Sequence, residues 1–225
     1  MTDEILTRRI FSMIAELSTV RASDIRLEHR LREDLGLDSV CSMELLSMLA
    51  EEFELDVPME EAAQLTCDFL DCLTRPVLAR HGTLDKYTGD GLVAFWGAPL
   101  PCADHADLAL DAAWEIVQEV RRFSAARQRE GKPPLRVRIG IESGLAMAGD
   151  FGTSSRSIYT AVGDSVNVAS RLEQLARDPS YDVIIGQGTA SRTRRHRLKL
   201  LGDVVLRGKE NPTTLYTLEP AGSPT

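Results

Sequence analysis

The sequence predicts an α+β protein in which a small helical bundle precedes a larger region of mixed strands and helices. Apolar residues recur at helical spacing over the first 65 residues, whereas short β-type runs alternate with helices from about residue 69. The charge changes at the same place: residues 1–65 contain 6 basic and 15 acidic side chains, a net −9, although the whole chain carries −8. This contrast indicates two modules with different partners, an acidic head (residues 1–66) and a near-neutral body (residues 69–219).

The composition of the 225 residues is that of an ordinary globular protein, with 43% apolar and 27% charged residues. No apolar run approaches the roughly 20 residues that a membrane-spanning helix needs, and the first thirty residues lack the apolar core of a signal peptide. We therefore expect a cytoplasmic protein without a membrane span. Reduced thiols are expected at all four cysteines, which are Cys41, Cys67, Cys72 and Cys102.

A basic run, Arg-Thr-Arg-Arg-His-Arg at residues 192–197, stands out near the C-terminus. A net-acidic chain repels phosphate backbones. We therefore interpret the run as a solvated turn and expect no nucleic-acid partner.

The head is predicted to contain three helices. Residues 3–17 carry an apolar stripe formed by Ile5, Leu6, Ile10, Met13, Ile14 and Leu17. Asp38 or Ser39 is a suitable N-cap for a second helix that ends near Phe53. The apolar positions of this second helix are Val40, Met43, Leu46 and Leu49. Pro58 ends the next loop, and residues 60–65 are predicted to form a short third helix.

The body is predicted to fold around one main sheet. Its helices are expected at residues 69–80, 103–129 and 163–176, with Pro76 kinking the first of them or beginning its later half. Gly89-Asp90-Gly91 predicts a tight hairpin with a carboxylate at its tip. Further strands are expected at residues 135–141, 145–149, 182–185, 198–201, 204–207 and 215–218.

The head resembles the acyl carrier protein family over about residues 3–66. Asp38-Ser39-Val40, following Asp34-Leu35-Gly36, matches the family's attachment motif, in which Leu is usual at the place of Val40. Glu44, Glu51-Glu52-Phe53 and Val57-Pro58 also fall where the family has them. The resemblance implies that a phosphopantetheinyl transferase attaches 4′-phosphopantetheine to Ser39 and that acyl-transfer enzymes dock on the acidic second helix. The residues alone also fit a plain capping serine.

The body resembles the catalytic domain of class III nucleotidyl cyclases, from about residue 69 to 219. Three blocks carry the resemblance, at residues 82–99, 137–144 and 159–173, and Leu206-Arg-Gly-Lys-Glu-Asn-Pro212 fits the basic turn of the family. The resemblance implies an incomplete class III cyclase α/β sandwich. It also implies a dimeric enzyme that converts ATP to cyclic AMP and pyrophosphate with Mg²⁺ or Mn²⁺.

The family's functional residues carry over one by one. Asp90 matches the second metal-binding aspartate, and Lys86 and Thr160 match the pair that reads adenine. Asn167 and Arg171, four residues apart on one helix face, match the pair that stabilises the transition state. From the residues alone, Asp90 also fits an ordinary turn and Lys86 a solvated strand position.

Two further cations, Arg207 and Lys209, are candidates for binding the terminal phosphates, and the sequence leaves open which of them reaches the phosphates. Scattered glycines form neither a P-loop nor a dinucleotide fingerprint.

One departure from the family is large. Intact members open with a strand that ends in Phe-x-Asp-Ile-x-Gly-Phe and carries the first metal aspartate, and no such motif is present here. A gene fusion, a truncated relic or a mistaken start site would each account for this. Three hypotheses follow: a cyclase half that acts in a homodimer or in a heterodimer with an intact cyclase chain, a carrier with an inert tail, or a remnant with neither activity.

Overall fold

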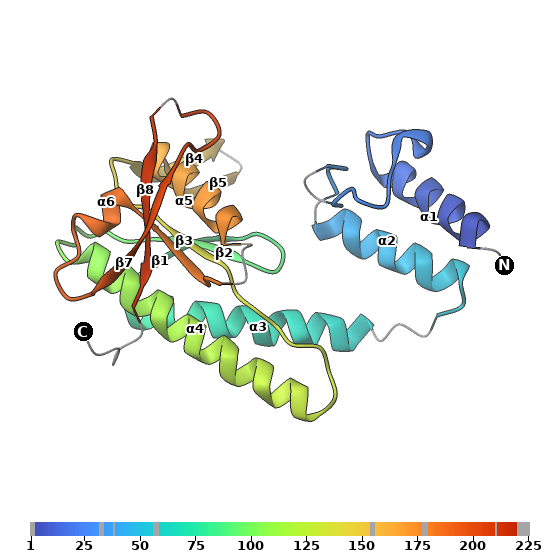
Figure 1. Cartoon of the computed structure of the whole chain (residues 1–225), viewed down its shortest axis with the longest axis horizontal. Helices are drawn as coiled ribbons and strands as arrows, with labels where there is room; N and C mark the ends of the chain where they lie inside the picture. The colour runs from blue at the N-terminus through green and yellow to red at the C-terminus, as the bar shows by residue number, and fades with distance from the viewer. Residues whose placement is uncertain are drawn as a thin grey trace. The chain divides into compact units, whose positions relative to one another are not determined.

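The computed structural model describes residues 3–31, 34–37, 39–55, 59–153, 156–176, 180–209 and 211–219. The chain divides into two compact units (Figure 1). The first comprises Met1–Cys67 and the turn Thr88–Gly91, and the second comprises Asp68–Tyr87 and Leu92–Thr225. Each unit is described by itself.

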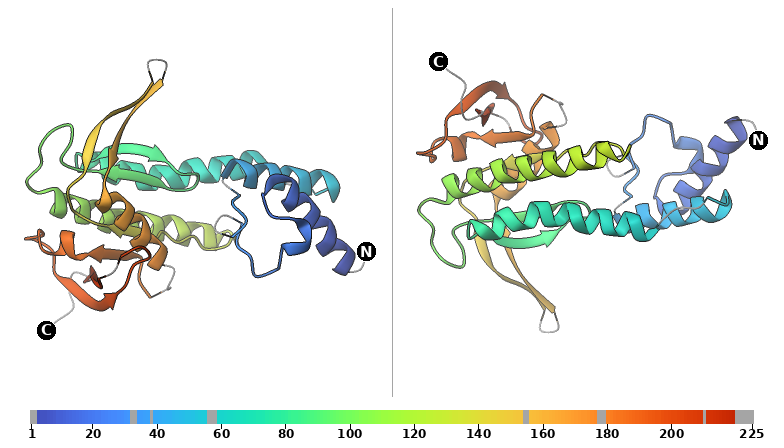
Figure 2. Two further views of the ribbon diagram at one scale, coloured as in Figure 1. Left: turned by 90° about the horizontal axis from the view of Figure 1, so that it is seen from above. Right: turned by 90° about the horizontal axis from the view of Figure 1, so that it is seen from below.

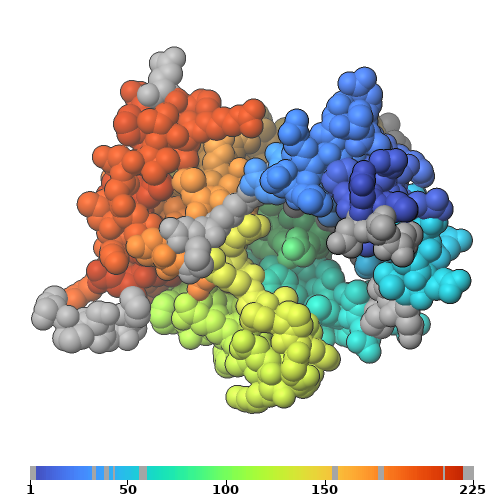
Figure 3. Space-filling model, turned by 45° about the vertical axis from the view of Figure 1, so that its right-hand side comes forward, coloured from blue at the N-terminus to red at the C-terminus, as the bar shows by residue number. Residues whose placement is uncertain are grey.

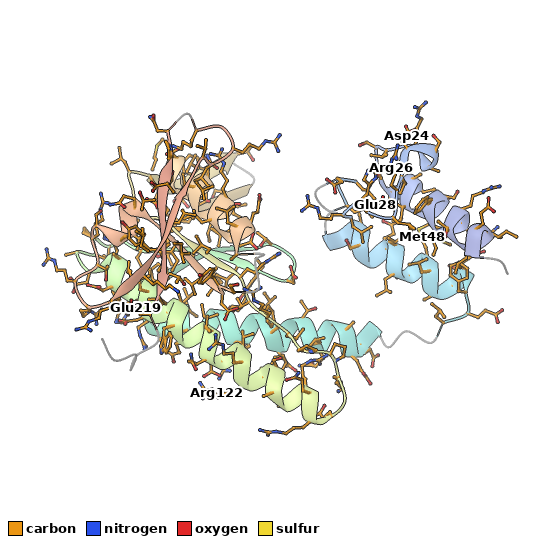
Figure 4. The ribbon with its side chains drawn as sticks, in the orientation of Figure 1. Asp24, Arg26, Glu28, Met48, Arg122 and Glu219 are labelled. Atoms are coloured by element: carbon orange, nitrogen blue, oxygen red, sulfur yellow. The ribbon has the colours of Figure 1, made fainter. Side chains whose placement is uncertain are left out.

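The first unit is helical, as predicted. Helix α1 spans Asp3–Leu17, a 3₁₀ turn η1 spans Ala22–Asp24, and helix α2 spans Ser39–Glu52. In Figure 4, Met48 of α2 points toward α1. The buried residues of this small core are Met13, Ile14, Ile25, Leu35, Leu37 and Leu45. In α2, Leu45 is buried and Leu49 packs against this core, whereas Leu46 is half-buried.

Helix α3 spans Met59–Ala79 without interruption, so the prediction of two helices at residues 60–65 and 69–80 was wrong. No Gly or Pro separates the two predicted segments, and the Thr66 hydroxyl donates to the Ala62 carbonyl within the helix. Pro76 lies inside α3, where it is buried. The two compact units meet at Cys67, within this helix.

The second unit begins within α3, at Asp68, and continues with an antiparallel hairpin, formed by β1 (Thr83–Tyr87) and β2 (Leu92–Phe95), as predicted. Helix α4 (His105–Arg129) follows. The rest of the unit consists of β3 (Ile139–Ile141), β4 (Met147–Thr153), β5 (Arg156–Val162), α5 (Asp164–Leu175), β6 (Val183–Gly186), α6 (Gln187–Ala190), β7 (Leu198–Val204) and β8 (Thr213–Leu218).

The strands form three separate sheets among the described residues, which corrects the expectation of one main sheet. Four strands form one hydrogen-bonded sheet in the order β3-β6-β8-β7. The pairs β1-β2 and β4-β5 each form a two-stranded sheet of their own. Strand β3 pairs in parallel with β6 and is an edge strand of this sheet as far as the described residues show. Figure 2 shows β4 and β5 as a long hairpin that extends away from α3 and α4.

Three strand predictions need correction. The region at 135–141 contains only the short β3. One strand, β7, replaces the two expected at 198–201 and 204–207, and it ends at Val204, so residues 205–207 lie outside it. The register of β7 against β8 shifts between Leu200 and Gly202. Gly202 adopts a φ of 120° there, and β7 continues through this irregularity to Val204. The strand β5 and the short helix α6 were not predicted.

The main core of the second unit lies between the helix pair α3 and α4 and the strands. Fully or nearly buried residues include Val77, Leu110, Val120 and Ile185. Side chains of β2 and of β3 pack on this same core although the two strands share no hydrogen bonds. A smaller cluster around Leu172 joins α5 to β6 and β8, and Figure 3 shows α5 (orange) beside the red β7 and β8.

The basic run at 192–197 is engaged within the second unit. The Thr193 hydroxyl and the Arg194 and Arg195 backbone N–H groups all donate to the buried carboxylate of Asp107 on α4. One turn further along α4, Asp111 pairs with the Arg195 guanidinium and the His196 ring. The run is therefore a structural turn that is tied to α4.

Candidate functional site

Strand β1 contains a bulge at Asp85. Its neighbours Leu84 and Lys86 pair with the consecutive residues Ala94 and Val93 of β2, so Asp85 has no partner in the ladder. Successive side chains of a regular strand point to opposite faces, and a bulge re-aims them. Here the Lys86 ammonium lies 3.7 Å from the Asp85 carboxylate.

The Asp85 carboxylate connects the two residues that were predicted to read a base. The Thr160 hydroxyl on β5 donates to Asp85 Oδ2 at 2.6 Å, and Lys86 Nζ approaches Oδ1. The Asp85 side chain is 1% exposed, whereas that of Lys86 is 54% exposed. The fold therefore brings Lys86 and Thr160 to one place, through a buried acid between them.

Helix α5 positions Asn167 and Arg171 one turn apart. The residues that follow them, Val168 and Leu172, are 6% and 0% exposed and pack the helix against the unit. Asn167 is exposed and Arg171 is half-buried. The backbone of Gly208 lies beside the Arg171 guanidinium, since a Cβ at Gly208 would come within 3.5 Å of it. The turn after β7 thus flanks Arg171.

The two predicted phosphate-binding cations differ in their surroundings. Lys209 forms an ion pair with Asp164 in the first turn of α5, whereas Arg207 is exposed. Lys209 also lines a cavity of about 490 Å³ at the N-terminus of α5. The cavity residues are Glu142, Ser143, Gly144, Leu145, Asp164, Ser165, Val168, Lys209, Asn211, Pro212 and Thr213.

Among the titratable groups that line this cavity, Glu142 has the largest shift in pKa. Burial raises its pKa to about 7, although backbone N–H groups of Gly188 and Ser143 donate to the carboxylate and act in the opposite direction. Its Oε2 is buried without a hydrogen-bond partner among the described residues. Gly186 and Gly188 leave room for the carboxylate, because a Cβ at either position would lie within 2.0 Å of a Glu142 oxygen.

Asp90 and Ser39 belong to the first unit. Asp90 is exposed in the β1–β2 turn, which is closed by a hydrogen bond from the Thr88 N–H to the Gly91 carbonyl. Within the described ranges, no group of three or more His, Cys, Asp or Glu side chains could hold a metal ion. In the described part of the chain, Asp90 is therefore not part of a carboxylate cluster.

Ser39 is the first residue of α2, the position that an attachment serine needs. Asp38 and the side chains of Ser39, Val40 and Met43 lie outside the described part of the chain. Glu44 and Glu51 of α2 are exposed, as a docking surface for basic enzymes requires.

Sequence reasoning missed Asp85 and Glu142. Asp85 is adjacent to Lys86, so strand alternation would place it on the opposite face, and only the bulge register reveals its role. Glu142 lies in the block at residues 137–144, which assigned it no role, although Gly186 and Gly188 leave space for its carboxylate.

Family models match both parts of the chain. A model of the adenylate and guanylate cyclase catalytic domain matches residues 75–220. A model of the phosphopantetheine attachment site matches residues 8–67. The chain therefore belongs to the adenylate and guanylate cyclase catalytic domain family, with a carrier domain fused ahead of the cyclase domain. Class III cyclase domains use Mg²⁺ or Mn²⁺, and phosphopantetheine-binding domains carry 4′-phosphopantetheine.

Two relatives give the scale of the match. Adenylate cyclase 1 of Rhizobium meliloti is 31% identical over 158 residues, which are 70% of this chain and 24% of that protein. The adenylate cyclase of Anabaena cylindrica is 30% identical over 157 residues, which are 68% of this chain and 31% of that protein. The chain thus spans less than a third of the length of these relatives.

Solved structures establish the fold. The adenylyl cyclase CyaB from P. aeruginosa is 24% identical, with a TM-score of 0.67 over 76% of this chain and 89% of that one. The guanylyl cyclase Cya2 is also 24% identical, with a TM-score of 0.66 over 75% of this chain and 85% of that one. Because both types superpose equally well, the fold itself does not select the base.

In the described part of the chain, no helix is long and apolar enough to cross a membrane. Among the described residues, the cysteines form no disulfide, and burial raises the pKa of the Cys72 thiol.

Proposed function

We propose that the body binds ATP and contributes to an adenylate cyclase site that forms between two chains. The observation that carries this proposal is the pairing of Lys86 with Thr160 around Asp85. An ammonium donates only, and it suits the acceptor N1 of adenine, while the Thr160 hydroxyl suits the exocyclic amine. The adenine-reading pair is thus assembled within one chain.

The proposed reaction is attack of the ribose 3′-hydroxyl on the α-phosphate, which forms cyclic AMP and releases pyrophosphate. Asn167 orients the ribose, and the Arg171 guanidinium meets the charge that develops on the α-phosphate. Lys209 or Arg207 binds the terminal phosphates, and the ion pair with Asp164 favours Lys209 as the ordered one of the two. Asp90 would hold a divalent cation, which supplies charge neutralisation at the triphosphate when it is bound.

The proposed site needs a partner chain. One carboxylate is a poor Mg²⁺ ligand set, because this ion requires near-octahedral oxygen ligation and retains its water. A homodimer of this chain would offer Asp90 alone at each site. We therefore expect little or no cyclase activity from the chain by itself, and activity when an intact cyclase chain supplies both metal-binding aspartates.

The test mixes this chain with an intact cyclase whose own Asn and Arg at the transition-state positions have been removed, and measures cyclic AMP. We expect rescue by this chain. Asn167→Ala or Arg171→Ala here should reduce the rescued rate by about 100- to 1000-fold, as loss of one oxyanion donor typically does. Asp90→Ala is the matched control and should change it little. Absence of rescue would contradict the proposal.

A second function is favoured by the match at residues 8–67, because Ser39 begins α2 within it. We propose that residues 1–66 carry 4′-phosphopantetheine on Ser39 for acyl-transfer partners. Incubation with coenzyme A and a phosphopantetheinyl transferase should add one phosphopantetheine mass to the chain and none to Ser39→Ala. Ser42→Ala, with another hydroxyl of α2 removed, should still be modified. A wild-type chain that several transferases leave unmodified would contradict this assignment.

A further inference from the structure

Asp85 occupies a position that neither motif matching nor strand alternation assigns a role. Its side chain is 1% exposed, and its Oδ1 is buried without a hydrogen-bond partner among the described residues. Burying a carboxylate is costly unless hydrogen bonds or ion pairs offset the loss of hydration. The contacts that the structure gives it are the Thr160 hydroxyl at 2.6 Å and the Lys86 ammonium at 3.7 Å. Both contacts are residues of the proposed base-reading pair.

The contact with Asp85 determines what Thr160 can offer a ligand. A hydroxyl has one proton and two lone pairs, and an ionised carboxylate can only accept. The Thr160 proton is therefore committed to Asp85 Oδ2, so only the oxygen lone pairs remain for a ligand. Lys86, beside it, has only protons to donate.

We propose that Asp85 is a positioning residue that selects adenine by fixing the hydrogen-bonding polarity of Thr160. The inference rests on the proposed nucleotide site. A donor at Lys86 beside an acceptor at Thr160 is complementary to a base edge with a ring acceptor and an exocyclic amine, which is the edge of adenine. Hypoxanthine and guanine present a ring N–H and a carbonyl oxygen there. The Lys86 donor would then face a donor, and the Thr160 acceptor would face an acceptor.

The bulge explains how one short strand supplies both groups. In a regular strand, Asp85 and Lys86 would point to opposite faces. Because Asp85 lacks a ladder partner on β2, its carboxylate reaches Thr160 while Lys86 stays within 3.7 Å and exposed. The sequence Asp-Lys thus acts as one recognition unit.

The experiment measures binding of ATP and of inosine triphosphate to the full chain by titration in the presence of Mg²⁺. The two nucleotides differ only at ring positions 1 and 6. We expect the wild type to favour ATP by about 5- to 150-fold, the discrimination typical of a bidentate contact to a base edge. Asp85→Asn, whose amide can either donate to Thr160 or accept from it, should reduce the preference to about threefold or less.

A double mutant separates this role from a structural one. In a Thr160→Val background, where no hydroxyl remains to be oriented, Asp85→Asn should leave the ratio of ATP to inosine triphosphate affinity unchanged. Thr160→Ser, which keeps the hydroxyl, should retain the wild-type preference. Thermal unfolding of each variant reports whether it is folded.

The outcomes separate the two claims. An Asp85→Asn chain that keeps the wild-type preference, or a shift of equal size in the Thr160→Val background, would overturn the role of Asp85 and leave the proposed nucleotide site standing. A wild-type chain that binds neither nucleotide, or both equally, would overturn the proposed adenine site itself.

Discussion

Buried carboxylates are the residues on which this structure depends most clearly, and Asp107 is the best connected of them. It is 4% exposed and accepts hydrogen bonds from three donors of the turn at residues 193–195. Burial acts to raise its pKa, but these hydrogen bonds and the Arg195 charge outweigh it, so the pKa of Asp107 is lowered. The same carboxylate therefore anchors the whole basic run.

Asp107→Ala should destabilise the chain by about 1–3 kcal/mol, because it leaves buried donors without an acceptor. Asp107→Asn keeps one acceptor oxygen and should lose less. Denaturant unfolding of the two variants and the wild type measures both effects. Equal stability of Asp107→Ala and wild type would contradict the anchoring role. Because the folded pKa is lowered, this contribution is present above pH 4 and disappears as the pH falls through the folded pKa.

Glu142 should produce the opposite pH dependence. Its folded pKa of about 7 lies above the unfolded value of about 4.3, so the folded state holds a proton that the unfolded chain has lost. Stability from this group is complete below about pH 4.3 and is lost as the pH rises through 7. Glu142→Gln should therefore flatten the fall in melting temperature between pH 5 and pH 8.

The surface variant Glu130→Gln, which removes the same charge from an exposed position, is the control for Glu142. Melting temperatures at constant ionic strength give the comparison. If Glu142→Gln and Glu130→Gln show the same pH dependence as the wild type, the buried carboxyl does not titrate in this range.

At the scale of elements, the packing of α5 on β3 depends on Gly140. A Cβ there would lie 2.1 Å from the Ala169 carbonyl oxygen and 2.3 Å from the Glu173 nitrogen, and both are backbone atoms that cannot rotate away. Gly140→Ala should thus force the helix from the strand and cost about 1–3 kcal/mol. Gly149→Ala, with nothing within 4 Å, should be neutral. Chemical denaturation measures the stability of both variants. An equal loss in both would mean that the cost does not come from the steric contact between α5 and β3.

Helices could be predicted from the sequence because the spacing of apolar residues that indicates a helix lies within the helical segment itself. The predicted helix at residues 3–17 has the bounds of α1, and those at 103–129 and 163–176 differ from α4 and α5 by only one or two residues at either end. Strand pairing was less predictable, because it depends on partners far along the chain. The isolation of β1-β2 from β3 and the bulge at Asp85 follow from register, which no local pattern encodes.

The candidate site shows the same limit. Lys86, Thr160, Asn167 and Arg171 were located by motif, and the structure brings the first two together and sets the others on one helix. Asp85 was not found, because its importance lies in a contact across 75 residues of sequence.

At the scale of the whole molecule, the β4–β5 hairpin has exposed apolar side chains, and we predict that they contact a second chain. Met147 and Val162 are directly opposite each other in the ladder and are 66% and 52% exposed. Met147→Lys should weaken self-association at least about tenfold, the effect of losing one hot-spot contact. Leu100→Lys, at a 79% exposed position of the same unit, is the matched control. Sedimentation over a concentration series measures both, and equal behaviour of the two variants would exclude this hairpin as the interface.

The unbroken helix α3 has a practical consequence for anyone who wishes to express the two units separately. Proteases cleave extended segments that fit their active-site clefts, and loops and termini provide such segments. The boundary at Cys67 instead lies in the middle of a 21-residue helix. Limited proteolysis should therefore spare this boundary, and a cut placed there by cloning would give each fragment a frayed half-helix. Fragments that both retain residues 59–79 would avoid this loss, at the expense of duplicating the segment.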